Sequence, residues 1–416
     1  METISAADLE PENAFLGNKL DVVPAAPAGR FEIDSISLGD RVVGVDWGDG
    51  HHSKFHFIWL RHNCFCAECG SSQDGIRFNL LTDIDPHVTG TVSVDDAGGL
   101  CVAWDRDDHE SRFDPAWLRS YCYSPEERDR RAGFRPQPWK NELVNDLPTV
   151  LAPGPDCSDE ARLEIYDLLL RHGFVRLAGV GTDPAETEAI AHLLGPIRET
   201  TENGYIYDVR SNPVSQFGAA TPMKQHPHTD DPYQYSPPGI DVFHCIRNPP
   251  GSGGKSVYVD GFAIAESLRV EEPEAFRLLT TVPLPFVRCH PGRVDFRTNA
   301  LVIRLDDRDR VVDVRFFDRG VAPLDLPAEL VEPMFAAQRA FIERMISPDF
   351  QIEFLLPEGD AVILDNSRLM HGRHAFTATS GRHIRLAYID REEFHARWRD
   401  VARRQGRLDH DAVLPH

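Results

Sequence analysis

The spacing of two metal-binding residue types near position 230 places the strongest constraint on how this chain folds. His228 and Asp230 are separated by one residue, and successive side chains of a β-strand point to opposite faces, so both lie on one side of a strand. They need a partner from elsewhere, and the candidate is His371, which precedes Gly-Arg well over a hundred residues later. Two histidines and one carboxylate form a facial triad, which holds iron(II) and leaves positions open to a cosubstrate and oxygen.

The pattern His-x-Asp alone is a weak signal, because a chain with 18 histidines and 66 acidic residues produces it by chance. The position of His371, near the end of a long β-rich region, strengthens the prediction. His226 and His228 also form a spacing that suits other metals, and the carboxylate of Asp230 favours iron. Asp231 alternates to the opposite face and is expected to make a turn or to contact a metal ligand from behind.

Length and composition limit the class of protein. The 416 residues, 41% of them hydrophobic, are enough for a sizeable core and too many for one small domain. The chain contains no run of about 18 apolar residues, so the sequence predicts no membrane-spanning helix. Residues 1–30 are acidic, contain proline and lack a signal-peptide pattern, so we expect a flexible tail and a soluble cytoplasmic protein. The formal charge of −22 argues against a nucleic-acid partner, which would need a basic patch.

A cysteine cluster predicts a zinc site in the first part of the chain. Residues 31–123 read as short strands, and Cys64, Cys66 and Cys69 follow a C-x-C-x2-C pattern within them. Three thiolates can bind a tetrahedral zinc if a fourth ligand closes the site. The candidates for this fourth ligand are His62, His87, Cys101 and His109. The alternative is three buried free thiols on a turn, although a small β domain often needs a metal to stabilise its thin core.

The remaining sequence predicts a mostly-β fold with flanking helices. Residues 124–150 are charged and rich in proline, and read as a linker. In residues 151–416 many short strands lie between helical segments without a βαβ rhythm, which favours a jelly-roll barrel, the double-stranded β-helix of cupin type. The predicted helices are 159–172, 185–194, 261–279 and 328–346. The predicted strands are 41–47, 53–60, 174–177, 205–209, 214–217, 240–246, 256–259, 302–305, 311–317, 351–355, 361–364 and 383–389.

Several motifs together resemble one family. They are Trp59 to Cys69, His228-Thr-Asp, Pro237-Pro-Gly-Ile, Phe243-His-Cys-Ile, Val259-Asp-Gly-Phe, Asp365-Asn and His371-Gly-Arg. The chain is similar over roughly residues 31–399 to the γ-butyrobetaine hydroxylase family, within the taurine-dioxygenase-like group of iron(II)- and 2-oxoglutarate-dependent oxygenases. The resemblance implies a small zinc domain followed by a double-stranded β-helix, a small-molecule substrate and a homodimer.

The resemblance also assigns residues to roles. His228, Asp230 and His371 fall on the iron ligands, and Cys64, Cys66, Cys69 and His109 on the zinc ligands. Arg382 falls on the arginine that holds the distal carboxylate of 2-oxoglutarate, for which a guanidinium is suited because it pairs bidentately and stays charged. Arg385 is the alternative for that role. Phe243 falls on an apolar residue that lines the cosubstrate pocket, and it is equally compatible with a core position.

The sequence differs from the family pattern at the positions that would hold the substrate. The family holds a trimethylammonium group in an aromatic cage by cation–π attraction, and the cage positions here are Asn203, Tyr207, Ala220 and Tyr388. Two of these are aromatic. Either the loop is shifted so that Tyr205 or Tyr207 completes the cage, or the substrate is a different small amine or carboxylate. A catalytically silent cupin-like binding protein remains as an alternative from another functional class.

Overall fold

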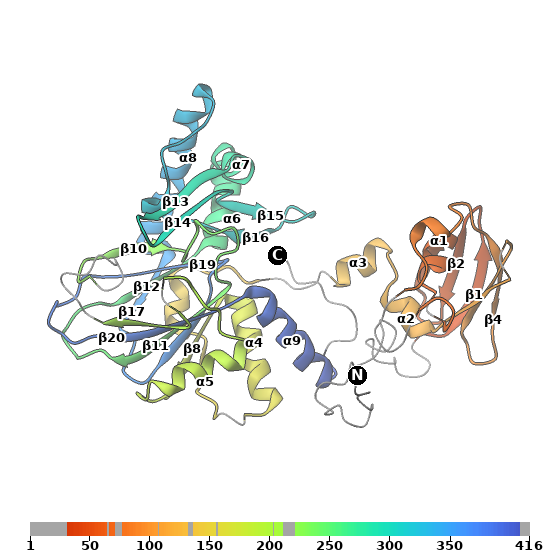
Figure 1. Ribbon diagram of the computed structural model, residues 1–416, viewed down its shortest axis with the longest axis horizontal. Helices are drawn as coiled ribbons and strands as arrows, with labels where there is room; N and C mark the ends of the chain where they lie inside the picture. The colour runs from red at the N-terminus through yellow and green to blue at the C-terminus, as the bar shows by residue number, and fades with distance from the viewer. Residues whose placement is uncertain are drawn as a thin grey trace, which may run out of the picture. The chain divides into compact units, whose positions relative to one another are not determined.

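The computed structural model describes residues 31–64, 66–70, 77–106, 108–131, 136–154, 157–202, 204–210 and 221–407. The chain divides into two compact units, one of residues 1–134 with 406–413 and one of residues 135–405 with 414–416 (Figure 1). The boundary falls inside the predicted linker. The tail expected at residues 1–30 and the strand expected at 214–217 lie outside the described residues.

The first unit contains two antiparallel sheets of three strands. One sheet consists of β1 (Ile33–Leu38), β2 (Val42–Trp47) and β3 (His52–His56), and the other of β4 (Gly90–Val94), β5 (Leu100–Trp104) and β6 (Glu110–Phe113). Its helices are α1 (Phe57–His62), the 3-10 turn η3 (Leu81–Asp83), α2 (Pro115–Ser120) and α3 (Pro125–Arg131). Buried aromatic side chains from both sheets and α2, including Trp47, Phe55, Trp104 and Trp117, form its core.

The strand predicted over residues 53–60 is wrong in its second half. The strand ends at His56, and α1 begins at Phe57. Phe57 and Leu60 are both buried, and residues three apart lie on one face of a helix. In a run this short, the same apolar residues fit both a strand and a helix. Periodicity alone therefore could not distinguish the two structures.

The second unit contains two sheets that pack face to face. The six-stranded sheet has the order β7 (Thr149–Leu151), β8 (Phe174–Ala178), β18 (Ala361–Asp365), β11 (Ile240–Arg247), β20 (His383–Ile389) and β9 (Ile206–Arg210). The four-stranded sheet has the order β10 (Gln225–His228), β19 (Leu369–Arg373), β12 (Ser256–Asp260) and β17 (Gln351–Phe354). Phe174 and Leu364 from the first sheet share a core with Tyr258 and Leu369 from the second. The predicted fold class, a jelly roll with flanking helices and a β-rich N-terminal region, is confirmed.

Helices cover this unit in two groups (Figure 1). The helices α4 (Asp159–His172), α5 (Ala185–Leu194) and α9 (Arg391–Arg404) pack together, with α4 and α5 against the six-stranded sheet. The helices α6 (Gly261–Glu271), α7 (Pro273–Thr281) and α8 (Ala328–Ile346) form the other group. The helix predictions 159–172, 185–194 and 328–346 are confirmed with these bounds. In the described part of the chain, none of the helices has the length and apolar character needed to cross a bilayer.

Two predictions in the helical region need correction. The helix expected over 261–279 is two helices, which meet at Glu272 and Pro273, because the ring of proline restricts the preceding residue and removes a backbone donor. The hairpin of β13 (Leu284–His290) and β14 (Val294–Ala300) was not predicted. The predicted hairpin that follows it is present as β15 (Ile303–Leu305) and β16 (Val311–Val314). Two further 3-10 turns are η6 (Asp318–Gly320) and η7 (Pro348–Phe350).

The second half of the predicted linker is part of the second unit. It contains the 3-10 helix η4 (Asn141–Asp146) and β7, which pairs with β8 as a parallel strand. The side chain of Trp139 is buried, and its Nε1 donates to the carbonyl of His172 at 2.7 Å. The backbone N of Trp139 donates to Asp260 at 3.0 Å. These contacts fix residues 136–150 to the sheet instead of leaving them as a free connection.

Candidate functional sites

The three clustered cysteines of the first unit meet one histidine. The Sγ atoms of Cys64, Cys66 and Cys69 lie 3.3, 3.7 and 3.4 Å from Nε2 of His109. A tetrahedral zinc with ordinary bond lengths separates a thiolate sulfur from an imidazole nitrogen by about 3.5 Å. The four donors therefore fit a zinc ion. Burial and the neighbouring thiols raise the pKa of Cys69 to about 12, so only a bound cation would keep this thiol deprotonated at neutral pH.

Local structure explains why His109 joins the cysteines and the other candidates do not. The helix α1 ends just before Cys64, and His109 directly precedes β6. Nδ1 of His109 contacts Glu68 at 3.1 Å, which leaves Nε2 for the metal. His62 lies 3.0 Å from Arg77 and Cys101 contacts Asp95 at 3.7 Å, and neither these two residues nor His87 belongs to the group of converging donors.

The second cluster lies at one end of the four-stranded sheet. The strands β10 and β19 pair antiparallel, with His228 directly opposite His371. Nε2 of His228 is 3.4 Å from Oδ1 of Asp230, and Nε2 of His371 is 3.7 Å from the same oxygen. The structure thus brings together the three residues that the sequence proposed. Asp230, however, does not lie on the strand, which ends at His228, so strand alternation is not what aims its side chain.

A side chain from a neighbouring segment holds Asp230 in place beyond the strand end. Oδ1 of Asn366 accepts from the backbone N of Asp230 at 2.7 Å, and Nδ2 of Asn366 donates to its carbonyl at 3.0 Å. The hydroxyl of Tyr388 donates to Oδ2 of Asp230 at 2.7 Å, which leaves Oδ1 facing the two histidines. Both contacts orient the carboxylate for a metal. The sequence had assigned Tyr388 to a substrate cage and had given Asn366 no role.

The two histidines present free ring nitrogens to the same point. Nδ1 of His228 donates to the carbonyl of His226 at 2.9 Å, so its Nε2 carries the lone pair that a metal requires. Burial lowers the pKa of His371 to about 4, despite the opposing effect of Asp230, and keeps this ring neutral at physiological pH. Phe243 and Phe317 pack on the two rings, with centroid distances of 4.7 Å to His371 and 4.9 Å to His228. The donor set fits iron(II).

Two further acidic residues lie close to the triad. Asp231 has a left-handed backbone with φ of 49°, and its carboxylate accepts from Tyr233 and Gln234. Burial and the charge of Asp230 raise the pKa of Asp231 to about 6. Asp241 on β11 is fully buried, and neither of its oxygens has a hydrogen-bond partner among the described residues. Burial, together with the charge of Asp230, raises the pKa of Asp241 well above its usual range. Asp241 was not predicted as a site residue, although an acidic residue inside an apolar strand is visible in the sequence.

A cavity of about 420 Å³ extends from the triad and is lined by Arg382, Phe243, Tyr207 and Tyr388. Arg382 is buried, its Nε has no partner, and no carboxylate pairs with its guanidinium in the described part of the chain. Burial lowers its pKa, as expected for a cation that lacks a counter-charge. Arg385, the alternative, lies 3.5 Å from Asp208 and does not line this cavity. The geometry therefore favours Arg382 as the residue that receives an anion.

The same cavity also carries further aromatic and acidic groups. Tyr207 on β9 and Phe317 line it, together with an ion pair between Arg288 and Glu202 at 3.0 Å. Tyr205 is exposed. Asn203 and Ala220, the other two proposed cage positions, lie outside the described residues.

Comparison with known proteins places the chain in a family. Residues 144–388 match the model of the "Taurine catabolism dioxygenase TauD, TfdA family", and residues 35–105 match "Gamma-butyrobetaine hydroxylase-like, N-terminal". The chain is 36% identical to a gamma-butyrobetaine dioxygenase of a Pseudomonas species, over 85% of this chain and 92% of that protein. It is 30% identical to the human gamma-butyrobetaine dioxygenase, over 88% and 96%. It is also 30% identical to a trimethyllysine dioxygenase of Meyerozyma guilliermondii, over 88% and 95%.

Fold and family model together define the class, the iron(II)- and 2-oxoglutarate-dependent dioxygenases. Within it, the chain belongs to the TauD, TfdA family. Among solved structures, a putative alpha-ketoglutarate-dependent taurine dioxygenase from Burkholderia xenovorans is similar, with a TM-score of 0.47, 14% identity, and coverage of 58% of this chain and 88% of that one.

Proposed function

We propose that this protein hydroxylates an unactivated C–H bond in a small substrate that carries an ammonium and a carboxylate group. His228, Asp230 and His371 would hold iron(II), and Arg382 would bind the distal carboxylate of 2-oxoglutarate. One observation carries the proposal: a buried guanidinium without a carboxylate partner opens on the same cavity as three convergent metal donors. Bound iron, 2-oxoglutarate and oxygen supply the oxidation, in which 2-oxoglutarate is converted to succinate and carbon dioxide.

The residues of the chain position these groups and exclude water. Tyr388 orients the carboxylate of Asp230, and Asn366 holds the backbone of the same residue. Phe243 covers the ring of His371, and Phe317 covers the ring of His228, so the metal donors face a largely apolar wall on those sides. Such preorganisation keeps the reacting groups in place without rearrangement at the moment of reaction.

The substrate end of the cavity suits a cation. Tyr207 offers an aromatic face and Asp231 places a carboxyl group on the same cavity, whereas Glu202 is paired with Arg288. An aromatic ring attracts a desolvated ammonium group by about 2 kcal/mol. Asn203 and Ala220 supply no rings, so we infer a substrate other than γ-butyrobetaine, an amino acid or natural-product intermediate that undergoes hydroxylation or desaturation. γ-Butyrobetaine, the compound in the relatives' names, is the alternative substrate.

Succinate formation tests this function. The full-length protein is loaded anaerobically with iron(II) and given 2-oxoglutarate, oxygen, and a panel of betaines and amino acids. We expect one panel member to stimulate succinate release at least about tenfold, with the stimulation lost in His228→Ala and Arg382→Ala. Arg385→Ala is the matched control, because Arg385 pairs with Asp208 away from the cavity. Absence of both stimulation and iron binding would favour the silent binding protein.

We further propose a structural zinc at Cys64, Cys66, Cys69 and His109, and a cytoplasmic homodimer. The zinc proposal is supported by the close approach of all four donor atoms. Elemental analysis of the purified protein should give one zinc per chain, reduced in Cys66→Ser. The homodimer rests on the family resemblance, and light scattering coupled to gel filtration should give twice the mass of the 46.8 kDa chain.

A further inference from the structure

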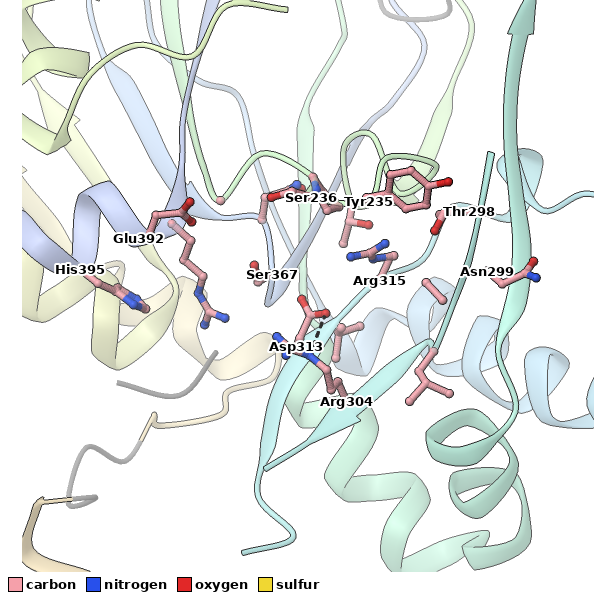
Figure 2. Close-up of a pocket in the computed structure, with 18 of the residues that line it drawn as sticks. Tyr235, Ser236, Thr298, Asn299, Arg304, Asp313, Arg315, Ser367, Glu392 and His395 are labelled. Atoms are coloured by element: carbon pink, nitrogen blue, oxygen red, sulfur yellow. Dashed lines mark ion pairs between the residues drawn. The ribbon is translucent and has the colours of Figure 1, made fainter. Parts of the chain in front are cut away.

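A second cavity, of about 540 Å³, lies in the unit that carries the triad (Figure 2). It is formed by α9, by the hairpin of β15 and β16, and by the segment around Tyr235. It shares Thr229 with the metal cavity, but His228, Asp230 and His371 do not line it. Its volume is in the range of small-molecule sites, about 300–1,000 Å³. The proposed oxygenase function does not use this cavity.

The charge of the lining is opposite to the charge of the chain. Four arginines and two acidic residues line the cavity, and one of these arginines, Arg391, is paired at 3.3 Å with Asp365, which is not part of the lining. The chain as a whole has 44 basic and 66 acidic residues. The charged residues of the lining are Arg304, Arg315, Arg391, Arg399, Asp313 and Glu392. A concave site with an excess of one charge concentrates ligands of the opposite sign.

The basic residues come from two walls of the cavity. Arg391, His395 and Arg399 are spaced four residues apart on α9, and such residues lie on one face of a helix. Arg304 on β15 and Arg315, just after β16, belong to the other wall. Figure 2 shows His395 and Glu392 on one side of the opening, and Arg304 and Arg315 on the other. This arrangement suits a ligand with anionic groups at both ends.

Arg315 provides an independent sign of a missing anion. Its Nη1 donates to two backbone carbonyls, those of Pro232 at 3.4 Å and Gln234 at 3.1 Å. Among the described residues, no carboxylate forms an ion pair with it, and burial lowers its pKa. Arg304 reaches Asp313 only at 3.7 Å, whereas Arg310 on the same hairpin pairs with Asp306 at 2.7 Å. A guanidinium removed from water without a counter-charge carries a desolvation cost that an anionic ligand would offset.

We propose that this cavity binds a small polyanion, a molecule with two or more carboxylate or phosphate groups. The hydroxyl groups of Ser236 and Ser367 also line it and can donate to such a ligand. Carboxylates and phosphates share the fork geometry that arginine recognises, so the lining does not separate the two. The binding experiment distinguishes carboxylate from phosphate ligands by using one probe of each kind.

Calorimetric titration of the metal-free full-length protein tests the proposal, with pyrophosphate and tricarballylate as probes. We expect at least one probe to bind, and the better probe identifies the ligand as a phosphate or a polycarboxylate. The double variant Arg304→Ala/Arg399→Ala should weaken binding about tenfold or more, because each lost charged hydrogen bond removes a substantial part of the affinity. Arg339→Ala, an exposed arginine on α8, is the matched control and should bind as the unmodified protein does.

Two further variants serve as controls. One tests whether the probes bind in this cavity and not at the cosubstrate site, and the other tests whether binding is lost through a change of charge and not through unfolding. Arg382→Ala should leave probe binding unchanged, because Arg382 lines only the metal cavity of the two. Asn299→Glu adds a carboxylate to an exposed lining position without removing an ion pair, and should also weaken binding. The proposal is overturned if neither probe binds at millimolar concentration. Binding that disappears in Arg382→Ala but survives in the double variant would overturn it as well.

Discussion

At the scale of single residues, one hydroxyl group determines which oxygen of Asp230 is free for a metal. Tyr388 donates to Oδ2 at 2.7 Å, and Oδ1 then faces both histidines. Tyr388 is a positioning residue in this description, since it acts through the carboxylate. The same ring also lines the cavity, so its aromatic face remains available to a substrate.

Replacement of Tyr388 by phenylalanine should separate these two roles. Tyr388→Phe keeps the ring and removes the hydrogen bond, so we expect the affinity for iron(II) to fall about 10- to 100-fold, as for other residues that orient metal ligands. The KM for substrate should change little. Metal titration and succinate assays at saturating iron measure the two effects, with Tyr235→Phe as the control because that side chain is 88% exposed. A change confined to KM would instead assign Tyr388 to the substrate alone.

At the scale of elements, the pairing of β10 with β19 sets the distance between the two histidines. Gly372 follows His371 on β19, and a Cβ atom there would lie 2.6 Å from the carbonyl oxygen of Gln225 and 2.8 Å from the nitrogen of Pro227. Both atoms belong to the backbone of β10. Glycine is therefore required here by close approach of two strands, and the His-Gly-Arg motif acquires a physical reason.

Substitution of Gly372 by alanine should force the two strands apart. Overpacking of this kind destabilises a protein by about 1–3 kcal/mol, and here the displacement falls on both histidines. We predict a measurable fall in melting temperature and loss of iron(II) binding in Gly372→Ala. Gly154→Ala is the control, because a Cβ there meets no atom within 4 Å. Normal iron affinity in Gly372→Ala would mean that the strands tolerate the methyl group.

The helix α2 offers a second prediction at this scale. Oδ1 of Asp114 accepts from the backbone N of Ala116 at 2.8 Å and of Trp117 at 3.1 Å, and so caps the helix. Asp114→Ala should destabilise the first unit by about 1 kcal/mol, while Asp114→Asn should retain most of the stability. Urea unfolding followed by tryptophan fluorescence measures both variants. Equal stability of the two variants would show that the cap contributes little.

Elements differ in how far the sequence could predict them. The bounds of α8 follow from a long amphipathic pattern, and those of α4 from Ser158 before it and Gly173 after it. The strand β13 escaped prediction because it contains a proline, which is uncommon inside strands, and β14 because polar residues outnumber apolar ones in it. The three triad residues could be proposed from spacing. The contact of Tyr388 with Asp230 could not, because it depends on strand register and on the chain path beyond β10.

At the scale of the whole molecule, two compact units each contain a metal-donor cluster, and the clusters differ in the size of the framework around them. The cysteine cluster lies beside a core made from two small sheets, whereas the triad lies on a large double-sheet framework. Stability of the first unit should therefore depend on metal much more than stability of the second. The four arginines of the second cavity were also beyond prediction, because they come from separate segments that only the fold brings together.

Removal of zinc should therefore unfold one unit selectively. Structural zinc contributes about 10–16 kcal/mol of apparent binding free energy in small zinc domains, so a chelator should abolish or strongly lower one calorimetric transition. The calorimetric transition of the second unit should remain, and its midpoint temperature should rise when Mn(II) and N-oxalylglycine are added. A single transition that responds to both treatments would indicate that the units unfold together.

The direct pairing of His228 with His371 has a consequence for how the protein is made. During synthesis, the ribosome releases the first histidine long before the second, and the ends of the intervening loop must then meet. Closure of so long a loop delays folding, because its entropy is lost before the contacts form. Until Tyr388 has also been synthesised, the nascent chain lacks the hydroxyl group that orients Asp230. A chain shortened before Arg382 would lack both the buried guanidinium of the cavity and the Tyr388 hydroxyl that orients Asp230.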